Sequence, residues 1–163
     1  MKGDKMVFRK AENKEAEDIM ALYNAVVGTP FCSWNESYPG ETEITEDLAY
    51  GTLYVLEKDQ ELIGAISIVP KNEMDDFVCW RIRENAREFA RVVLRPDQQQ
   101  KGLSVHLVEG IVQELQKQDV SAIHIAVAKN NIPAQKLYRK TGFEFCGEAD
   151  MYGHSYFLCE RML

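Results

Sequence analysis

Apolar residues recur along the chain with two spacings. Steps of three or four residues are typical of amphipathic helices, whereas alternating or short continuous apolar runs are typical of strands. We therefore predict helices over residues 14–27, 45–50, 103–118 and 132–140. We predict strands over residues 7–10, 53–57, 62–69, 87–94, 123–127, 143–151 and 155–161.

The order of these elements, β α α β β β α β α β β, favours an α/β fold with helices on both faces of a mixed sheet. A polar loop over residues 71–86 separates the third and fourth predicted strands. No internal repeat, low-complexity tract or linker is visible. We therefore expect residues 1–163 to form a single domain.

Net charge narrows the range of partners. The chain carries a net charge of −7, which argues against nucleic acid as a partner because such proteins present a basic face. Residues 91–140 are an exception, with eight lysines or arginines and only four acidic residues. This stretch is either a chance fluctuation on a solvated surface or the surroundings of an anion site.

The sequence predicts a cytoplasmic protein with no membrane partner. No segment approaches the roughly 20 apolar residues that span a bilayer, and the charged start of the chain lacks the apolar core of a signal peptide. Four cysteines lie at positions 32, 79, 146 and 159, with no CxxC pair and no histidine at zinc-ligand spacing. We expect reduced thiols and no metal site.

One candidate anion site lies between a predicted strand and a predicted helix, over Arg95–Ser104, which reads RPDQQQKGLS. Such a turn directs backbone N–H groups toward one point, and the helix dipole adds partial positive charge there. Gly102 permits close approach of a phosphate, the Gln99 amide can donate and Lys101 adds charge. The pattern matches neither common phosphate-binding glycine motif, so a purely connecting turn remains the alternative.

A second segment, Asn130–Glu148, reads NNIPAQKLYRKTGFEFCGE. Asn131 and Pro133 suit the start of a helix, and Gly142 suits its end. Together with Gln99-Gln100-Lys101-Gly102-Leu103-Ser104, this segment resembles the GNAT superfamily of acetyl-CoA-dependent N-acetyltransferases. The family pattern Q/R-x-x-G-x-G/A corresponds to residues 99–104. The pattern N-x-x-A-x-x-x-Y-x-x-x-G-F is intact as Asn131, Ala134, Tyr138, Gly142 and Phe143.

The resemblance implies a GNAT-like splayed mixed sheet of about seven strands with about four helices, and acetyl-CoA as cosubstrate. The backbone amides of residues 99–104 would hold the pyrophosphate, and the backbone of residues 92–94 would pair with the pantetheine arm. An amide of that strand would polarise the acetyl carbonyl. The implied cofactor-binding residues are Val92, Val93, Leu94, Gln99, Gln100, Lys101, Gly102, Leu103, Ser104 and Asn131.

The same resemblance implies that Tyr138 protonates the departing thiolate, a role suited to a phenol. The alternative is a helix tyrosine packed on the core. Ser104 departs from the family pattern, which has glycine or alanine there. Its hydroxyl either donates to a phosphate or adds bulk that weakens the close approach of the cofactor.

An amine nucleophile is mostly protonated at neutral pH and needs a base. Glu88, near the start of the strand 87–94, is the candidate base, and an exposed strand-end carboxylate is the alternative. His124 and His154 are secondary candidates. Branches of the family that acetylate ribosomal-protein N-termini have a glutamate where this chain has Ala126, which argues against that activity.

The acceptor is expected beside the segment CSWNESYP, residues 32–39. Trp34 and Tyr38 would supply an aromatic wall, Glu36 would meet an ammonium, and Trp80 would join them. The alternative is that these aromatics cap the edge of the core.

We expect acetyl transfer by direct attack on a primary amine of a small molecule or of a peptide. An aminoglycoside-like antibiotic is a variant of this acceptor. The contrasting hypothesis is a non-catalytic acyl-CoA-binding sensor or regulatory module. The protein is expected to be a monomer or a homodimer.

Overall fold

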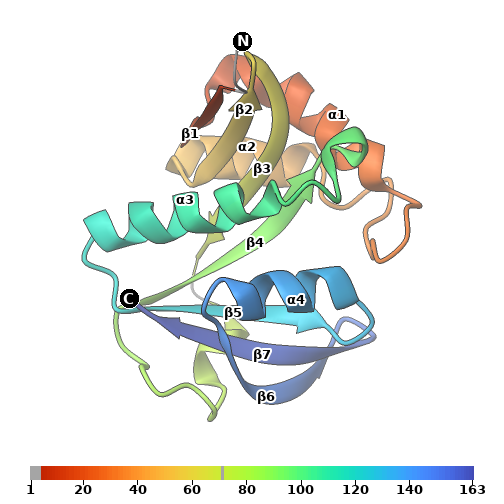
Figure 1. Cartoon of the computed structure of the whole chain (residues 1–163). Helices are drawn as coiled ribbons and strands as arrows, with labels where there is room; N and C mark the ends of the chain where they lie inside the picture. The colour runs from red at the N-terminus through yellow and green to blue at the C-terminus, as the bar shows by residue number, and fades with distance from the viewer. Residues whose placement is uncertain (1–4, 71) are drawn as a thin grey trace. The chain divides into compact units, whose positions relative to one another are not determined.

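The computed structural model describes residues 5–70 and 72–163. This part of the chain forms seven strands and four α-helices in the predicted order (Figure 1). The strands follow the hydrogen-bonded order β1-β2-β3-β4-β5-β7-β6, and β4 pairs parallel with β5. The elements are β1 Met6–Lys10, α1 Ala16–Val26, α2 Glu41–Tyr50, β2 Leu53–Lys58, β3 Glu61–Val69, β4 Ala86–Leu94, α3 Ser104–Lys117, β5 Ala122–Ala128, α4 Ile132–Lys140, β6 Glu144–Met151 and β7 His154–Met162.

The predicted α/β class with a mixed sheet is confirmed. The chain divides into two compact units. Unit 1 holds Met1–Ile68 with Ala90–Ile111, and unit 2 holds Val69–Phe89 with Val112–Leu163. Strand β4 and helix α3 each contribute residues to both units. None of the helices in residues 5–70 and 72–163 has the length and apolar character needed to cross a bilayer.

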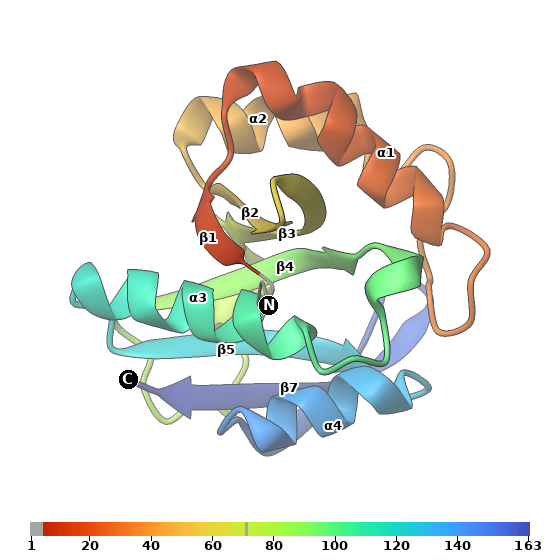
Figure 2. The same ribbon diagram turned by 45° about the horizontal axis from the view of Figure 1, so that its top comes forward.

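In unit 1, β1, β2 and β3 form an antiparallel meander. Asp59 and Gln60 both have positive φ at the β2–β3 turn, which suits a tight hairpin. Helices α1 and α2 lie together on one side of these strands (Figure 2). Their apolar faces pack on β2 and β3 in a core of Ile19, Leu22, Tyr23, Val26, Ile44, Leu53, Val55, Ala65 and Val93.

Close packing between β3 and β4 depends on Gly64. A Cβ atom there would lie 2.9 Å from the Val93 carbonyl oxygen and 3.1 Å from Leu107 Cδ1. A side chain at this position would therefore push apart β3, the end of β4 and the start of α3, all in unit 1.

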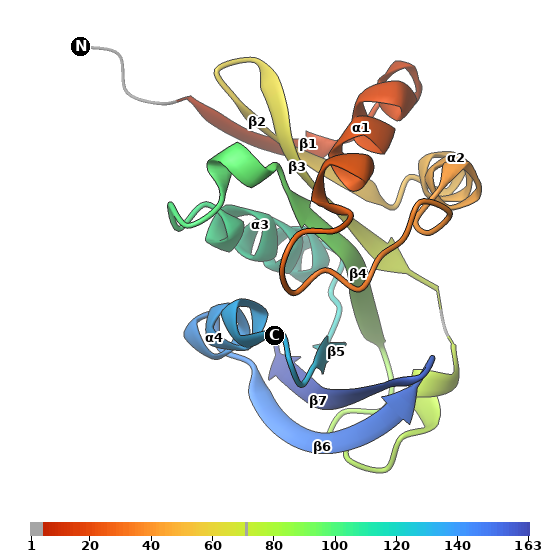
Figure 3. The same ribbon diagram turned by 90° about the vertical axis from the view of Figure 1, so that its right-hand side faces the viewer.

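In unit 2, β5, β7 and β6 are antiparallel neighbours, and the β6–β7 hairpin curves beside α4 (Figure 3). Tyr138 of α4 packs with Phe89 and Phe143, the three ring centroids lying 5.7–5.8 Å apart. A second apolar cluster holds Met74, Trp80 and Leu158. The unit therefore has a core of its own.

Most predicted boundaries agree with the structure to within one or two residues, and three local features differ in kind or by more. Helix α2 begins at Glu41, four residues before the predicted start at Thr45, because the Glu43 carboxylate accepts the Gly40 N–H at 3.0 Å and stabilises an earlier first turn. The helix predicted from residue 14 begins as a 3₁₀ turn, Asn13–Glu15. The predicted loop 71–86 contains a 3₁₀ turn, Glu73–Asp76; its first residue, Lys71, lies outside the described residues.

Candidate active site

The predicted anion-binding turn follows β4 in unit 1. Pro96–Gln98 form a 3₁₀ turn, and Gln98 is buried with its amide oxygen 3.2 Å from Lys58 Nζ. These contacts fix the start of the turn against the β2–β3 hairpin. The rest of the turn, Gln99–Gly102, is exposed to solvent.

The exposed half of the turn has unusual backbone angles. Gln100 and Gly102 have φ values of 63° and 75°. Alternating left-handed residues turn successive N–H groups toward one side, which makes an anion-binding concavity. A Cβ at Gly102 would meet no atom within 4 Å, so the space over this backbone is open. Helix α3 begins two residues later at Ser104, and its dipole favours an anion there.

Side chains of the turn are less available than its backbone. Gln99, expected to donate its amide to a phosphate, instead donates Nε2 to the Leu94 carbonyl at 2.9 Å. Arg95 is held by Asp97 at 2.7 Å and by Glu61 at 3.4 Å. The Gln99 N–H also donates to the Pro96 carbonyl at 3.2 Å. The groups that remain for an anion are the backbone amides of residues 100–104, the exposed Lys101 and the Ser104 hydroxyl.

The segment expected to meet the pantetheine arm lies at the end of β4. Strand β4 pairs with β5 at Ala86, Arg87 and Glu88, so residues 92–94 lie beyond this pairing. Val92 is half-buried, whereas Val93 and Leu94 are buried. Just before them, Arg91 has a φ of 52° within the strand, which redirects the adjoining peptide groups.

The expected acceptor loop belongs to unit 1. The Trp34 ring packs edge-on against Tyr23 at 5.4 Å and is half-buried. Glu36 is exposed, and Tyr38 is 44% exposed with its hydroxyl 3.5 Å from Arg91 Nη1. Trp34 therefore packs against the apolar core beneath α1. Tyr38 exposes its ring to solvent.

Unit 2 holds the candidate acid, Tyr138, on α4. Its side chain is buried between Phe89 and Phe143. Burial raises the pKa of this phenol well above its ordinary value, because ionising it in apolar surroundings is costly. The phenol stays protonated across the physiological range, as a proton donor must.

Asn131 caps the same helix. Its Oδ1 accepts the Ala134 N–H at 3.1 Å, as the sequence predicted for a helix start. Because the oxygen is engaged by the cap, the amide nitrogen is the group of Asn131 that remains for a ligand.

The candidate base, Glu88, is half-buried on β4 and accepts a hydrogen bond from Asn72 Nδ2. Its register partner on β5 is His124, whose Nε2 lies 2.9 Å from Glu160 Oε2. Paired residues of parallel strands share a face of the sheet, so Glu88 and His124 are neighbours.

Trp80, expected to join the aromatic wall, is packed inside unit 2. It is buried and stacks on His124 with ring centroids 3.9 Å apart. Its Nε1 donates to the Met74 carbonyl at 2.7 Å. Its stacking contact and its hydrogen bond thus both lie within unit 2. This agrees with the alternative that Trp80 caps the edge of the core.

Two thiols of unit 2, Cys146 and Cys159, are poorly suited to nucleophilic catalysis. Cys79 and Cys146 lie with their sulfur atoms 3.1 Å apart. Burial raises the pKa of Cys146 to about 12 and that of Cys159 to about 12. Both are protonated at neutral pH, and a thiol attacks only as its thiolate.

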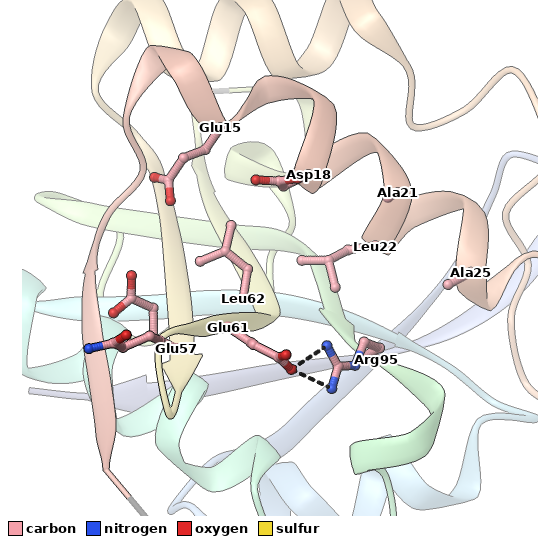
Figure 4. A pocket seen from close by; sticks show the side chains of 10 residues that line it. Glu15, Asp18, Ala21, Leu22, Ala25, Glu57, Glu61, Leu62 and Arg95 are labelled. Carbon is pink, nitrogen blue, oxygen red and sulfur yellow. Dashed lines mark hydrogen bonds and ion pairs between the residues drawn. The ribbon is translucent and has the colours of Figure 1, made fainter.

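A hollow in unit 1 lies between α1 and the β2–β3 hairpin (Figure 4). It has a volume of about 420 Å³. Its carboxylates are mostly paired, since Glu15 and Glu57 share Arg9 and Glu61 meets Arg95. Of the residues singled out in the sequence, only Arg95, the first residue of the anion-binding turn, lines this hollow.

Sequence reasoning missed two buried side-chain pairs beside the candidate residues. Asp47 meets Arg91 at 2.9 Å in unit 1, and Glu160 meets His124 in unit 2. The signal for Asp47 was a charge three residues after Ile44, on the apolar face of a helix. The signal for Glu160 was a charge within the last apolar strand.

Comparison with known proteins supports the same assignment along most of the chain. A family model described as the acetyltransferase (GNAT) family matches residues 19–143. The chain is 26% identical over 157 residues to an L-methionine sulfoximine/L-methionine sulfone acetyltransferase of Pseudomonas paraeruginosa, covering 91% of this chain and 86% of the relative.

Solved structures share the fold. A GNAT-family acetyltransferase of Streptococcus agalactiae matches with a TM-score of 0.82 at 19% identity, over 97% of this chain and 95% of the other. A protein of Salmonella typhimurium, solved with its cofactor acetyl-CoA, matches with a TM-score of 0.76 at 17% identity, over 98% and 94%. A ribosomal-protein-alanine N-acetyltransferase of Brucella melitensis has a TM-score of 0.75 at 20% identity, over 96% and 99%.

Proposed function

Because the chain belongs to the acetyltransferase (GNAT) family, whose members use acetyl-CoA, we propose that it transfers the acetyl group of acetyl-CoA to a primary amine. The observation that carries the cofactor part is the turn after β4. Its left-handed residues Gln100 and Gly102, the open space over Gly102 and the following helix start together form an anion site.

In this proposal the backbone amides of residues 100–104 hold the pyrophosphate, since the Gln99 N–H is engaged by the Pro96 carbonyl, and Lys101 adds a positive charge. The Ser104 hydroxyl donates to a phosphate. Backbone groups of residues 92–94 pair with the pantetheine arm, and the amide nitrogen of Asn131 contacts it. The cofactor is held mainly by backbone, since the nearby side chains of Gln99 and Arg95 are already engaged.

The chemical step is direct attack. The amine nitrogen adds to the thioester carbonyl, a backbone amide of β4 stabilises the oxyanion, and the C–S bond then breaks. Tyr138 gives its proton to the departing thiolate, and Glu88 takes the proton of the amine, directly or through water. The high pKa of the Cys146 thiol supports this route over an acetylated cysteine intermediate.

The acceptor class we favour is a small amino-acid-like amine rather than a peptide. The curated relative at 26% identity is named for L-methionine sulfoximine and L-methionine sulfone. The ribosomal-protein N-acetyltransferases share the fold at 20% identity or less, and this chain has Ala126 where that activity places a glutamate.

Tyr138→Phe tests the mechanism. Losing a general acid should lower turnover about 100-fold or more, while acetyl-CoA affinity stays within about twofold, because the ring packing is kept. Turnover is measured by thiol release with the best amine of a panel that includes L-methionine sulfone and a ribosomal-protein peptide. Tyr50→Phe is the control, since Tyr50 is 80% exposed at the end of α2.

Unchanged turnover and an unchanged pH profile in Tyr138→Phe would contradict the acid role. Binding of acetyl-CoA with no thiol release for any amine would instead favour a non-catalytic acyl-CoA sensor.

A further inference from the structure

Arg91 has a backbone conformation that its side chain does not favour. Its φ of 52° lies in the left-handed region, inside strand β4. Such angles are uncommon for residues other than glycine, and they persist where the surrounding structure enforces them. Some contact of Arg91 must therefore offset the cost of this conformation.

The contact is with Asp47 of α2. Nη2 of Arg91 lies 2.9 Å from both carboxylate oxygens of Asp47, and Nε lies 3.1 Å from Oδ2. The two side chains are only 12% and 7% exposed. This is a bidentate, largely buried ion pair, the strongest class of side-chain hydrogen bonding.

Further groups in unit 1 orient the pair. Ser67 of β3 donates to Asp47 Oδ2 at 2.8 Å, and the Tyr38 hydroxyl lies 3.5 Å from Arg91 Nη1. The carboxylate is thus fixed from β3 as well as from its own helix. The guanidinium has little freedom to leave it, so the backbone of Arg91 is restrained through its side chain.

The restraint acts next to the residues that matter for the cofactor. A left-handed residue in a strand redirects the peptide groups on either side. Val92, Val93 and Leu94 follow immediately, beyond the residues of β4 that pair with β5. Their peptide groups are the ones assigned above to the pantetheine arm and the acetyl carbonyl.

We propose that the Asp47–Arg91 ion pair is a positioning device that holds the left-handed turn at Arg91 and thereby aims the peptide groups of residues 92–94 at acetyl-CoA. Neither side chain touches the reacting atoms in this proposal. It rests on the proposed function, because it assigns a role to the same strand.

Two double variants separate the conformation from the ion pair. Asp47→Ala with Arg91→Gly removes both buried charges, and glycine adopts the left-handed conformation freely. Asp47→Ala with Arg91→Ala removes the same charges but leaves a Cβ that disfavours this conformation. Affinity for acetyl-CoA and for CoA is measured by calorimetry, and the folded fraction of each variant is checked by circular dichroism.

We expect the glycine double variant to bind acetyl-CoA about tenfold more tightly than the alanine double variant, from the usual cost of a left-handed non-glycine residue. The difference in affinity between the two variants should be larger for acetyl-CoA than for CoA, because only acetyl-CoA carries the acetyl thioester carbonyl that the peptide groups align.

Equal affinities in the two double variants would overturn the proposal and leave the pair a purely structural role. If neither double variant folds, Asp47→Asn replaces them, and unchanged affinities there overturn it equally. If the wild-type protein itself does not bind acetyl-CoA, the proposed function is wrong. That outcome is distinct from equal affinities in the two double variants, which contradict only the positioning role.

Discussion

The two units of the molecule each bury a carboxylate that is paired with a basic side chain beside candidate site residues, but the two carboxylates restrain different parts of the chain. In unit 1, Asp47 meets the permanently charged Arg91, whose own backbone is left-handed. In unit 2, Glu160 meets His124 and also accepts the N–H groups of Arg81 and Ile82, each at 3.0 Å.

The difference lies in what the buried carboxylate restrains. Asp47 acts through one side chain on one strand residue. Glu160 holds a loop, because its two backbone hydrogen bonds fasten residues 81 and 82 next to the stacked pair Trp80 and His124. The restraint on β4 at Arg91 therefore depends on one side-chain ion pair, whereas the restraint on residues 81 and 82 is shared by two backbone hydrogen bonds to Glu160.

The largest effect is expected from Asp47→Ala. It leaves Arg91 buried without a counter-charge, which typically costs about 3–5 kcal/mol of stability. Urea or thermal unfolding measures the change. A loss below about 1 kcal/mol would show that water reaches the guanidinium, and would remove the contrast with unit 2.

A smaller loss, about 1–3 kcal/mol, is expected from Glu160→Gln, which keeps an oxygen acceptor but removes the charge. Burial alone would raise the pKa of Glu160, but the N–H groups of Ile82 and Arg81 and the contact with His124 outweigh burial and lower it. A lowered folded-state pKa contributes stability above the ordinary glutamate value of about 4.3, and this is lost as the pH falls through the folded value.

The stability difference between wild type and Glu160→Gln should therefore shrink on acidification below about pH 4. Unfolding measured at a series of pH values tests this. A difference that grows on acidification would mean that the sign of the pKa shift is wrong.

The smallest effect is expected from Glu144→Gln in unit 2. Its carboxylate lies 3.2 Å from Arg81 Nη1, and the two side chains are 63% and 64% exposed. Exposed ion pairs contribute little, so the free energy of unfolding should change by no more than about 0.5 kcal/mol. A change comparable to that of Glu160→Gln would show that exposure does not separate the two carboxylates.

The sequence was sufficient to predict the order of elements, because apolar spacing and helix-ending glycines are local signals. It was also sufficient to identify the turn after β4 and the cap at Asn131. The predicted start of α2 was wrong because the cap comes from Glu43, a residue inside the helix that bonds back to Gly40.

The long-range pairs were beyond such reasoning. Asp47 and Arg91 are 44 residues apart, and His124 and Glu160 are 36 apart. No local pattern joins them, and a charge among apolar residues indicates only that a partner exists. The engagement of Gln99 by the Leu94 carbonyl was hidden for a different reason, since an amide can donate to backbone or to phosphate equally well.

Calorimetric titration of the purified protein with acetyl-CoA, and with CoA for comparison, tests the central claim most directly. Our account predicts one-to-one binding, with acetyl-CoA bound more tightly than CoA. No binding at millimolar concentrations of either ligand would contradict it, because the turn over residues 99–104 would then not hold a pyrophosphate.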